Sequence, residues 1–292
     1  MAIVDTNMQG KVCMVTGATS GIGKATALGL AQIGATVVMV ARDPARGEIA
    51  QNEIKTKSGN NAIDLLLADL SSQQSIRQLA ENFQQRYTQL HVLINNAGTI
   101  RLTRRETVDG LEMTFAVNHL APFLLTNLLL DVLKANAPAR IVNVSSSAHE
   151  AGYIKMDDLQ TKKHYRPMRV YGQSKLALML FTYELARRLE GTGVTANCLH
   201  PGFAATNIGQ SGLGLVGRAV AKFIVSRLGI SPEEGAKTSI YLASSPDVEG
   251  VTGKYFVQSI PQRSVPISYD ESLQQQLWEE SARLVNLPAK VL

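Results

Sequence analysis

The sequence contains few of the residues that build disulfide frameworks or metal sites. It has only two cysteines among 292 residues, Cys13 and Cys198, and each lies inside an apolar run. We expect both to be buried free thiols, which excludes a disulfide scaffold. The five histidines do not have the spacing of metal ligands, so we predict no metal centre.

Long apolar runs and blocks of one charge are also missing. No stretch approaches about eighteen uninterrupted apolar residues, and the first residues do not form the pattern of a signal peptide. The net charge is +5 and the basic residues form no single tract, which argues against nucleic acid as a partner. We expect a cytoplasmic protein and do not expect membrane contact.

What the sequence has instead is a regular alternation of short apolar runs with helical patterns. The runs are rich in valine and isoleucine, as in strands that helices cover on both faces. They lie at 11–17, 36–41, 62–68, 91–96, 139–146, 194–200 and 253–257. The helical patterns lie at 22–33, 45–57, 72–87, 107–135 (with a break expected at Pro122), 170–190, 232–244 and 269–285. This order predicts an α/β protein with a single-domain Rossmann fold, a doubly wound parallel sheet of about seven strands flanked by helices.

No repeat or linker divides the chain, so residues 1–292 are predicted to form one domain. We expect residues 10–200 mainly to bind cofactor and carry catalysis. Residues 201–292 would supply a substrate loop, the last strand and the C-terminal helix. Two long connections, 147–169 and 202–230, follow strands, where open α/β sheets bind their ligands.

A glycine-rich turn separates the first predicted strand from the first helix. Glycines allow the backbone to approach a pyrophosphate closely, and the helix N-terminus offers unpaired N–H groups to it. The spacing is G-x-x-x-G-x-G, which differs from the general dinucleotide fingerprint. The predicted phosphate-binding residues are Gly17, Thr19, Ser20, Gly21, Ile22 and Gly23.

The end of the second strand favours one of the two nicotinamide cofactors. NAD enzymes of this architecture usually place an acidic residue there, whereas this sequence has Ala41 followed by Arg42. A guanidinium can bind a 2′-phosphate, and Lys24 can add a second positive charge. We therefore expect NADP(H) to be preferred, with NAD(H) still possible if Asp43 points at the ribose.

Several short motifs follow one another along the chain: TGATSGIG (16–23), Asp69, NNAG (95–98), FAVNH with Asn118, VNVSS, YGQSK (171–175) and HPG (200–202). With these motifs in this order, the sequence from Gly10 to about Val257 resembles the short-chain dehydrogenase/reductase family. Ser146 and Tyr171 are 25 residues apart, farther than is common in the family. This insertion, with ARDPARGE and VNVSSSAH, resembles the retinol dehydrogenase branch, whose substrates are apolar. That branch often has an N-terminal membrane segment, which we do not expect here, so its substrate does not transfer.

The resemblance implies a catalytic tetrad of Asn118, Ser146, Tyr171 and Lys175. Tyr171 and Lys175 stand four apart on a predicted helix and therefore share one face. A nearby ammonium would lower the tyrosine pKa from its reference of about 10 and make it a general acid and base. Lys175 would also bind the nicotinamide ribose, and Ser146, with Ser145 and Ser147 as its competitors, would bind the substrate oxygen. In the family the Asn118 carbonyl holds a water in a proton relay.

The remaining family motifs imply further cofactor contacts. These residues are Asp69, Leu70, Asn95, Ala97, Gly98, Pro201, Gly202 and Thr206, together with Tyr171 and Lys175 of the tetrad. Asn95, Ala97 and Gly98 would pass the adenine ribose and stabilise the sheet. Asp69 would contact the adenine, or else act as a helix cap beside Ser71 and Ser72.

The expected substrate is a mostly apolar small-molecule alcohol or carbonyl. The pattern of residues 213–230 predicts one apolar helical stripe of Val216, Val220, Phe223 and Ile224. We interpret it as a lid packed on its own core, a substrate gate or, least favoured, a membrane contact. A homo-oligomer is possible. The alternative functions are a non-catalytic dinucleotide sensor or scaffold, which typically loses the tyrosine or lysine, and a nucleotide-sugar epimerase or dehydratase, which needs a second substantial domain. The sequence therefore favours an enzyme that interconverts an alcohol and a carbonyl.

Overall fold

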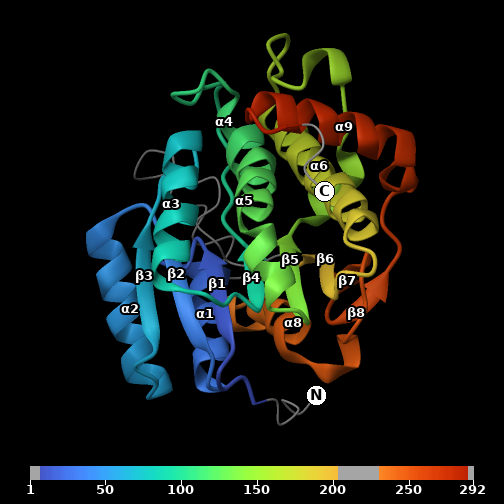
Figure 1. The fold of residues 1–292 in the computed structure, drawn as a ribbon. Helices are drawn as coiled ribbons and strands as arrows, with labels where there is room; N and C mark the ends of the chain where they lie inside the picture. Colours follow the sequence, from blue (N-terminus) through green and yellow to red (C-terminus); the bar gives the residue numbers. More distant parts are fainter. Residues whose placement is uncertain (1–6, 203–229, 289–292) are drawn as a thin grey trace.

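The computed structural model describes residues 7–202 and 230–288. It contains one sheet of eight strands in the order β3-β2-β1-β4-β5-β6-β7-β8. The strands are β1 (Val12–Thr16), β2 (Thr36–Ala41), β3 (Ile63–Leu67), β4 (Val92–Asn95), β5 (Ala139–Val144), β6 (Val194–His200), β7 (Tyr255–Val257) and β8 (Ile260–Gln262). Every neighbouring pair is parallel except β7 and β8. The predicted doubly wound parallel sheet is therefore confirmed (Figure 1).

The sheet has one strand more than the seven predicted. A two-residue turn, in which Gln258 and Ser259 have φ of 50° and 63°, leads from β7 into β8. Hairpin turns of this kind need positive φ at their central residues. β8 has only three residues, all exposed, and contains Pro261, so it lacks the apolar alternation by which strands are recognised.

Helices cover both faces of the sheet. One layer consists of α1 (Gly21–Gln32), α2 (Pro44–Ser58) and α8 (Pro232–Ser244), and the other of α3 (Gln73–Arg86), α5 (Ala121–Ala135) and α6 (Pro167–Arg188). Side chains of a strand alternate between the faces. Cys13 and Val15 thus belong to the core of the first layer, and Met14 to that of the second. Both predicted thiols are free and buried.

The helix predicted from residue 107 begins later, at Met113. Gly110 has a φ of 74° and forms a turn, and Glu112 caps the helix by accepting the N–H groups of Thr114 and Phe115 at 2.9 and 2.7 Å. These local hydrogen bonds fix the start of the helix, whereas the apolar periodicity alone extended it too far.

The expected break at Pro122 does not occur. The short helix α4 (Met113–Phe115) passes through a π-helical turn, Ala116–Leu120, directly into α5. Together they form one helix that is long and apolar enough to cross a membrane, but 78% of its most apolar window is buried inside the protein. It is a core helix of this domain.

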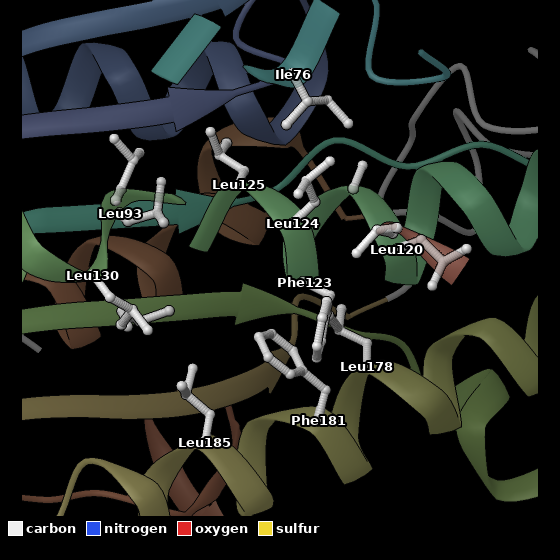
Figure 2. Close-up of a cluster of buried hydrophobic side chains, with 14 of the residues drawn as sticks. Ile76, Leu93, Leu120, Phe123, Leu124, Leu125, Leu130, Leu178, Phe181 and Leu185 are labelled. Atoms are coloured by element: carbon white, nitrogen blue, oxygen red, sulfur yellow. The ribbon is translucent and has the colours of Figure 1, made fainter. Parts of the chain in front are cut away.

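Aromatic rings join α5, α6 and the C-terminal helix α9 (Glu271–Leu284). The ring centroids of Phe123 on α5 and Phe181 on α6, shown in Figure 2, are 5.2 Å apart. Trp278 of α9 packs against both rings at 4.9 and 5.8 Å. The C-terminal helix thereby lies across α6 (Figure 1). It holds in place the helix that carries Tyr171 and Lys175.

Candidate active site

The site forms at the carboxyl ends of the parallel strands, where β1 and β4 are neighbours. After β1 the chain builds β2 and β3 toward one edge, and from β4 onward it builds toward the other. Loops that leave two such strands in opposite directions open a crevice, the usual ligand site of this architecture. The glycine-rich turn follows β1 into this crevice.

The glycine-rich turn has the backbone geometry that the sequence predicts for a phosphate cradle. Gly17 and Gly21 have φ of 68° and 55°, a conformation that favours glycine. A Cβ at Gly17 would lie 3.0 Å from the Ala97 Cα, and one at Gly23 would collide with the Gly17 carbonyl. Ser20 starts α1 without a side-chain cap, and the first helical turn has no acidic residue. These features fit the pyrophosphate of a dinucleotide at the helix N-terminus.

Asn96 holds this turn in place, a role that the sequence analysis missed. Its Nδ2 donates to the Thr16 carbonyl at 2.8 Å, and its backbone N–H donates to the Thr16 hydroxyl at 3.0 Å. Asn95, which was named instead, points into the protein and binds Thr126 and Asn143 at 3.1 and 2.8 Å. The alternation of side chains at the end of a strand was the available signal, since adjacent residues face opposite sides.

Arg42 is well placed to bind a phosphate. It is exposed at the end of β2 and has no hydrogen bond or ion pair with any residue of the described ranges. Asp43 caps α2, and its Oδ1 accepts the N–H of Arg46 at 3.0 Å. Lys24, expected to provide a second positive charge, instead forms an ion pair with Glu53. Of the two positive charges that the sequence predicts for the 2′-phosphate, Arg42 is therefore the one that is not paired with a carboxylate.

Asp69 forms a turn rather than a helix cap. Its Oδ1 accepts hydrogen bonds from the backbone N–H and the hydroxyl of Ser71, at 2.9 and 2.7 Å. The cap of α3 is Ser72, which accepts the N–H of Ser75 at 3.3 Å. Leu70 packs against the core beside this turn. The predicted contacts of Asp69 and Leu70 with the adenine stay predictions.

The structure brings the four residues of the tetrad together. The Ser146 side chain lies close enough to Tyr171 to act on its pKa, and the Lys175 Nζ lies 5.8 Å from the centroid of the Tyr171 ring. A Cβ at Gly98 would lie 3.5 Å from the Asn118 Oδ1 and 3.6 Å from the Lys175 Nζ. Gly98 is therefore the narrow point at which the loop after β4 passes between Asn118 and Lys175.

Of the three adjacent serines, Ser146 is the one whose side chain acts on the pKa of Tyr171. The buried Ser145 hydroxyl donates to the Lys175 carbonyl at 3.1 Å. Ser147 starts the 3-10 helix Ser147–Ala151, and the Ser146 hydroxyl accepts the N–H of Ala148 at 3.2 Å. The geometry thus separates Ser146 from the competitors that the sequence left open.

Burial controls the titration of the central pair. Burial raises the pKa of Tyr171, and its hydrogen bond with Ser146 opposes that rise. Burial also lowers the pKa of Lys175 to about 8. The pKa of Tyr171 is therefore raised rather than lowered as expected, and the group that opposes the rise is Ser146 rather than Lys175. The Lys175 Nζ is instead directed to the Val144 carbonyl, at 2.8 Å.

Asn118 lies in the π-helical turn and anchors the loop after β4. Its Oδ1 accepts the N–H of Thr99 at 2.7 Å, and its Nδ2 donates to the Thr99 carbonyl and to the Ser174 hydroxyl, both at 2.9 Å. Pro122 follows four residues later and has no N–H, so the usual α-helical bond to the Asn118 carbonyl cannot form. The Asn118 carbonyl therefore accepts no hydrogen bond from the residue four positions later, as it would in a regular α-helix.

The last predicted cofactor contacts follow β6. Gly202 has a φ of 86°, and a Cβ there would meet the Ile230 side chain at 2.6 Å. Pro201 precedes it and directly follows the end of β6. Thr206 and most of the predicted substrate stripe at 213–230 lie outside the described residues. Within the described ranges, no group of three or more histidine, cysteine, aspartate or glutamate side chains could hold a metal ion.

A dinucleotide cradle beside a half-buried tyrosine and a buried lysine defines a nicotinamide-dependent oxidoreductase of the Rossmann type. The chain also matches the family model for short chain dehydrogenase over residues 11–212, and it belongs to that family. It is 45% identical to retinol dehydrogenase 14 of Mus musculus over 291 residues, which cover 96% of this chain and 87% of that protein. It is 42% identical to polyprenol dehydrogenase of Homo sapiens over 283 residues, with coverages of 95% and 86%.

Solved structures have the same fold. An uncharacterized protein from Mycobacterium Paratuberculosis has a TM-score of 0.78 and 32% identity, over 97% of this chain and 96% of that one. The Pseudomonas aeruginosa RhlG/NADP active-site complex has a TM-score of 0.68 and 27% identity, with coverages of 86% and 96%. The predicted retinol dehydrogenase-like member of the family, an enzyme that uses NAD(P), is confirmed.

Proposed function

We propose that this enzyme interconverts an alcohol and a carbonyl on a mostly apolar small molecule, with NADP(H) preferred and Tyr171 as the general acid and base. The observation that carries the proposal is the placement of the Tyr171 and Ser146 side chains close together beside the buried Lys175. A substrate oxygen placed between these two hydroxyls can accept a hydrogen bond from each. The two groups would then stabilise the charge that develops on that oxygen.

In carbonyl reduction, Tyr171 donates its phenolic proton to the substrate oxygen, and in alcohol oxidation it takes that proton back. The bound nicotinamide supplies or accepts the hydride at the carbon. Lys175 favours the phenolate when charged and is aimed along the end of β5 by its bond to Val144. Asn118 keeps the Thr99 loop against the lysine, and Ser146 orients the substrate oxygen.

The preference for NADP(H) rests on Arg42 and on the role of Asp43. The exposed guanidinium can form charge-assisted hydrogen bonds with a 2′-phosphate. One Asp43 carboxylate oxygen already serves as the cap of α2, which reduces its capacity to bind a ribose hydroxyl. The structure of RhlG, which contains NADP, adds support from a relative of the same fold.

The apolar character of the substrate rests on side chains beside the site and on the names of relatives. Met168 is 64% exposed and lies one helical turn before Tyr171, and Tyr153 is 68% exposed in the insertion that leads to α6. Exposed apolar groups close to a binding site suit hydrocarbon surface. Retinol and polyprenol, named in two relatives, are alcohols with long hydrocarbon parts.

We further propose that the protein acts in the cytoplasm without membrane contact, as the sequence predicts. If it forms a homo-oligomer, the contact should not use the faces of α5 and α6 that Trp278 covers. Light scattering coupled to size exclusion would give the mass.

The proposed function is tested by a screen of aldehydes, ketones and alcohols of graded size with NADPH, NADH and their oxidised forms, followed at the nicotinamide absorbance. We expect hydride transfer to apolar aldehydes with NADPH. Tight NADPH binding with no turnover of any compound would instead favour the sensor or scaffold. A preference for nucleotide sugars would favour the epimerase class.

A further inference from the structure

Two histidines bind opposite sides of the same peptide group, the one that joins Ser146 to Ser147. The Nδ1 of His149 lies 2.7 Å from the Ser146 carbonyl oxygen. The N–H of Ser147 donates to the Nδ1 of His200 over 3.2 Å. His149 lies in the 3-10 helix Ser147–Ala151, and His200 ends β6, so the two rings come from separate elements. We call His149 and His200 the histidine clamp.

The two hydrogen bonds fix the proton positions on both rings. A carbonyl oxygen only accepts, so the Nδ1 of His149 must carry a hydrogen; an N–H only donates, so the Nδ1 of His200 must be bare. A neutral His200 therefore has its proton on Nε2. Protonation would add a hydrogen to the Nδ1 of His200 that faces the N–H of Ser147, and that bond would be lost.

The surroundings lower the pKa of both rings and so disfavour their charged forms. Burial lowers the pKa of His200, the nearby His149 lowers it further, and Glu150 opposes both effects. Burial also lowers the pKa of His149, against the Ser146 carbonyl and Glu150, which raise it. The ring of Tyr255 from β7 packs on His149 at a centroid distance of 5.1 Å. Within the described part of the chain, the charged side chain that acts on the pKa of both rings is Glu150, which is exposed at the surface.

We propose that His149 and His200 are positioning residues, which hold the peptide group after Ser146 and thereby aim the Ser146 hydroxyl at Tyr171. Rotation of this peptide group changes the backbone angle that places the Ser146 side chain relative to β5. It also moves the N–H of Ala148, which donates to the Ser146 hydroxyl. The clamp resists this rotation from both sides. The inference rests on the proposed function, because it gives Ser146 a role in binding the substrate oxygen.

Two substitutions of His200 distinguish the loss of its hydrogen-bond acceptor from the loss of its ring. In His200→Asn the Oδ1 takes the place of Nδ1 and can accept the N–H of Ser147, whereas His200→Leu keeps an apolar side chain and cannot. We expect His200→Leu to lose between about tenfold and about a hundredfold in kcat for aldehyde reduction, with the NADPH Kd unchanged. His200→Asn should recover most of that loss.

The pH profile gives a second readout that a merely structural role would not change. The kcat of the wild type should fall as the pH drops below the ordinary histidine pKa, because protonated His200 releases Ser147. An amide does not titrate, so His200→Asn should lack this acid limb. Equal kcat values for the asparagine and leucine variants, or an acid limb that persists in His200→Asn, would overturn the proposal. If His200→Leu does not fold, the pH profile of His200→Asn by itself tests the proposal.

His91 provides a matched control. Its Nδ1 accepts the N–H of Val12 at 3.1 Å, the same kind of bond, at the opposite end of the sheet. His91→Leu should leave kcat and the acid limb unchanged. Nitrogen NMR of labelled histidine distinguishes failure of the clamp from failure of the proposed function, since the tautomer is read without turnover. A wild type without hydride transfer would refute the function alone, and a His200 protonated at Nδ1 would refute the clamp.

Discussion

The Lys175 Nζ donates a 2.8 Å hydrogen bond to the Val144 carbonyl oxygen, and this bond joins α6 to the end of β5. Tyr171 lies one helical turn before the lysine, and Ser146 lies two residues after the valine. The bond therefore sets the separation between the two hydroxyls that we expect to hold the substrate oxygen. It also places a lysine ammonium in a buried position, where its charge is costly.

This cost predicts a dependence of stability on pH. Burial lowers the pKa of Lys175 to about 8 in the folded protein, whereas an unfolded lysine has a pKa of about 10.4. Between these values the unfolded chain binds more protons, so this lysine makes the free energy of unfolding rise with pH, by on the order of 3 kcal/mol. Urea unfolding of wild type and Lys175→Met from pH 7 to 10 measures the difference. A difference that does not change with pH would show that the lysine is not desolvated.

A second prediction concerns Arg42. Removal of its guanidinium in Arg42→Ala should weaken NADPH binding by about 1.5–3 kcal/mol, the range for a hydrogen bond to a charged group. NADH has no 2′-phosphate, so its affinity should be preserved. Titration of cofactor fluorescence gives both dissociation constants. Arg86→Ala, at the far end of α3, serves as the control and should change neither constant. Equal losses for NADPH and NADH would contradict the assignment.

Asp43 gives a third prediction, since the sequence allowed it either to bind the ribose or to do something else. As the cap of α2 it should matter for stability: Asp43→Ala should lower the free energy of unfolding by about 0.5–2 kcal/mol. Asp43→Ser keeps an oxygen that can accept the Arg46 N–H and should restore most of the loss. A large, selective loss of NADH affinity in Asp43→Ala would show that the carboxylate binds the ribose after all.

The sequence predicts the strands and most helices because each carries its own periodic signal. Where the prediction failed, short-range hydrogen bonds decided the outcome. Glu112 sets the start of α4 through two backbone N–H groups, and the turn at Gln258 and Ser259 adds a strand that has no apolar pattern. Lys24 was expected near the cofactor, but the neighbouring helix offers Glu53, which only the packing of α1 on α2 reveals.

In the candidate site, too, the sequence predicts some features and only the structure shows others. The family motifs name Asn118, Ser146, Tyr171 and Lys175, and the structure brings all four together. The hydrogen bonds of Asn96 to Thr16 and that of His200 in the histidine clamp join residues that are distant in sequence. Local sequence patterns do not predict such contacts. The balance between burial and hydrogen bonding that sets the pKa of Tyr171 likewise depends on the depth of the site, which spacing along a helix does not give.

A fourth prediction tests the apolar character of the substrate. Along a series of straight-chain aldehydes, each added methylene should improve binding by up to about 0.8 kcal/mol while it is buried. Met168→Ser should reduce this gain, because it removes exposed hydrocarbon one turn before Tyr171. Ile49→Ser, which removes an exposed side chain from α2, is the matched control and should leave the trend unchanged. A flat series in the wild type would argue for a polar substrate.

The last prediction concerns the two residues on which the proposed chemistry depends most. Tyr171→Phe removes only the hydroxyl, so the fold and the cofactor site should survive while the proton donor is lost. General acid–base catalysis is typically worth about 10²–10⁴-fold, and we expect kcat to fall by at least that factor. Lys175→Met should also lose activity, but through two effects, because the lysine is expected to support the phenol and to bind the nicotinamide ribose. NADPH affinity should therefore be near normal in Tyr171→Phe and weakened in Lys175→Met, as measured by fluorescence titration beside single-turnover kinetics. A folded, cofactor-loaded Tyr171→Phe enzyme that reduced an aldehyde at close to the wild-type rate would mean that another group delivers the proton.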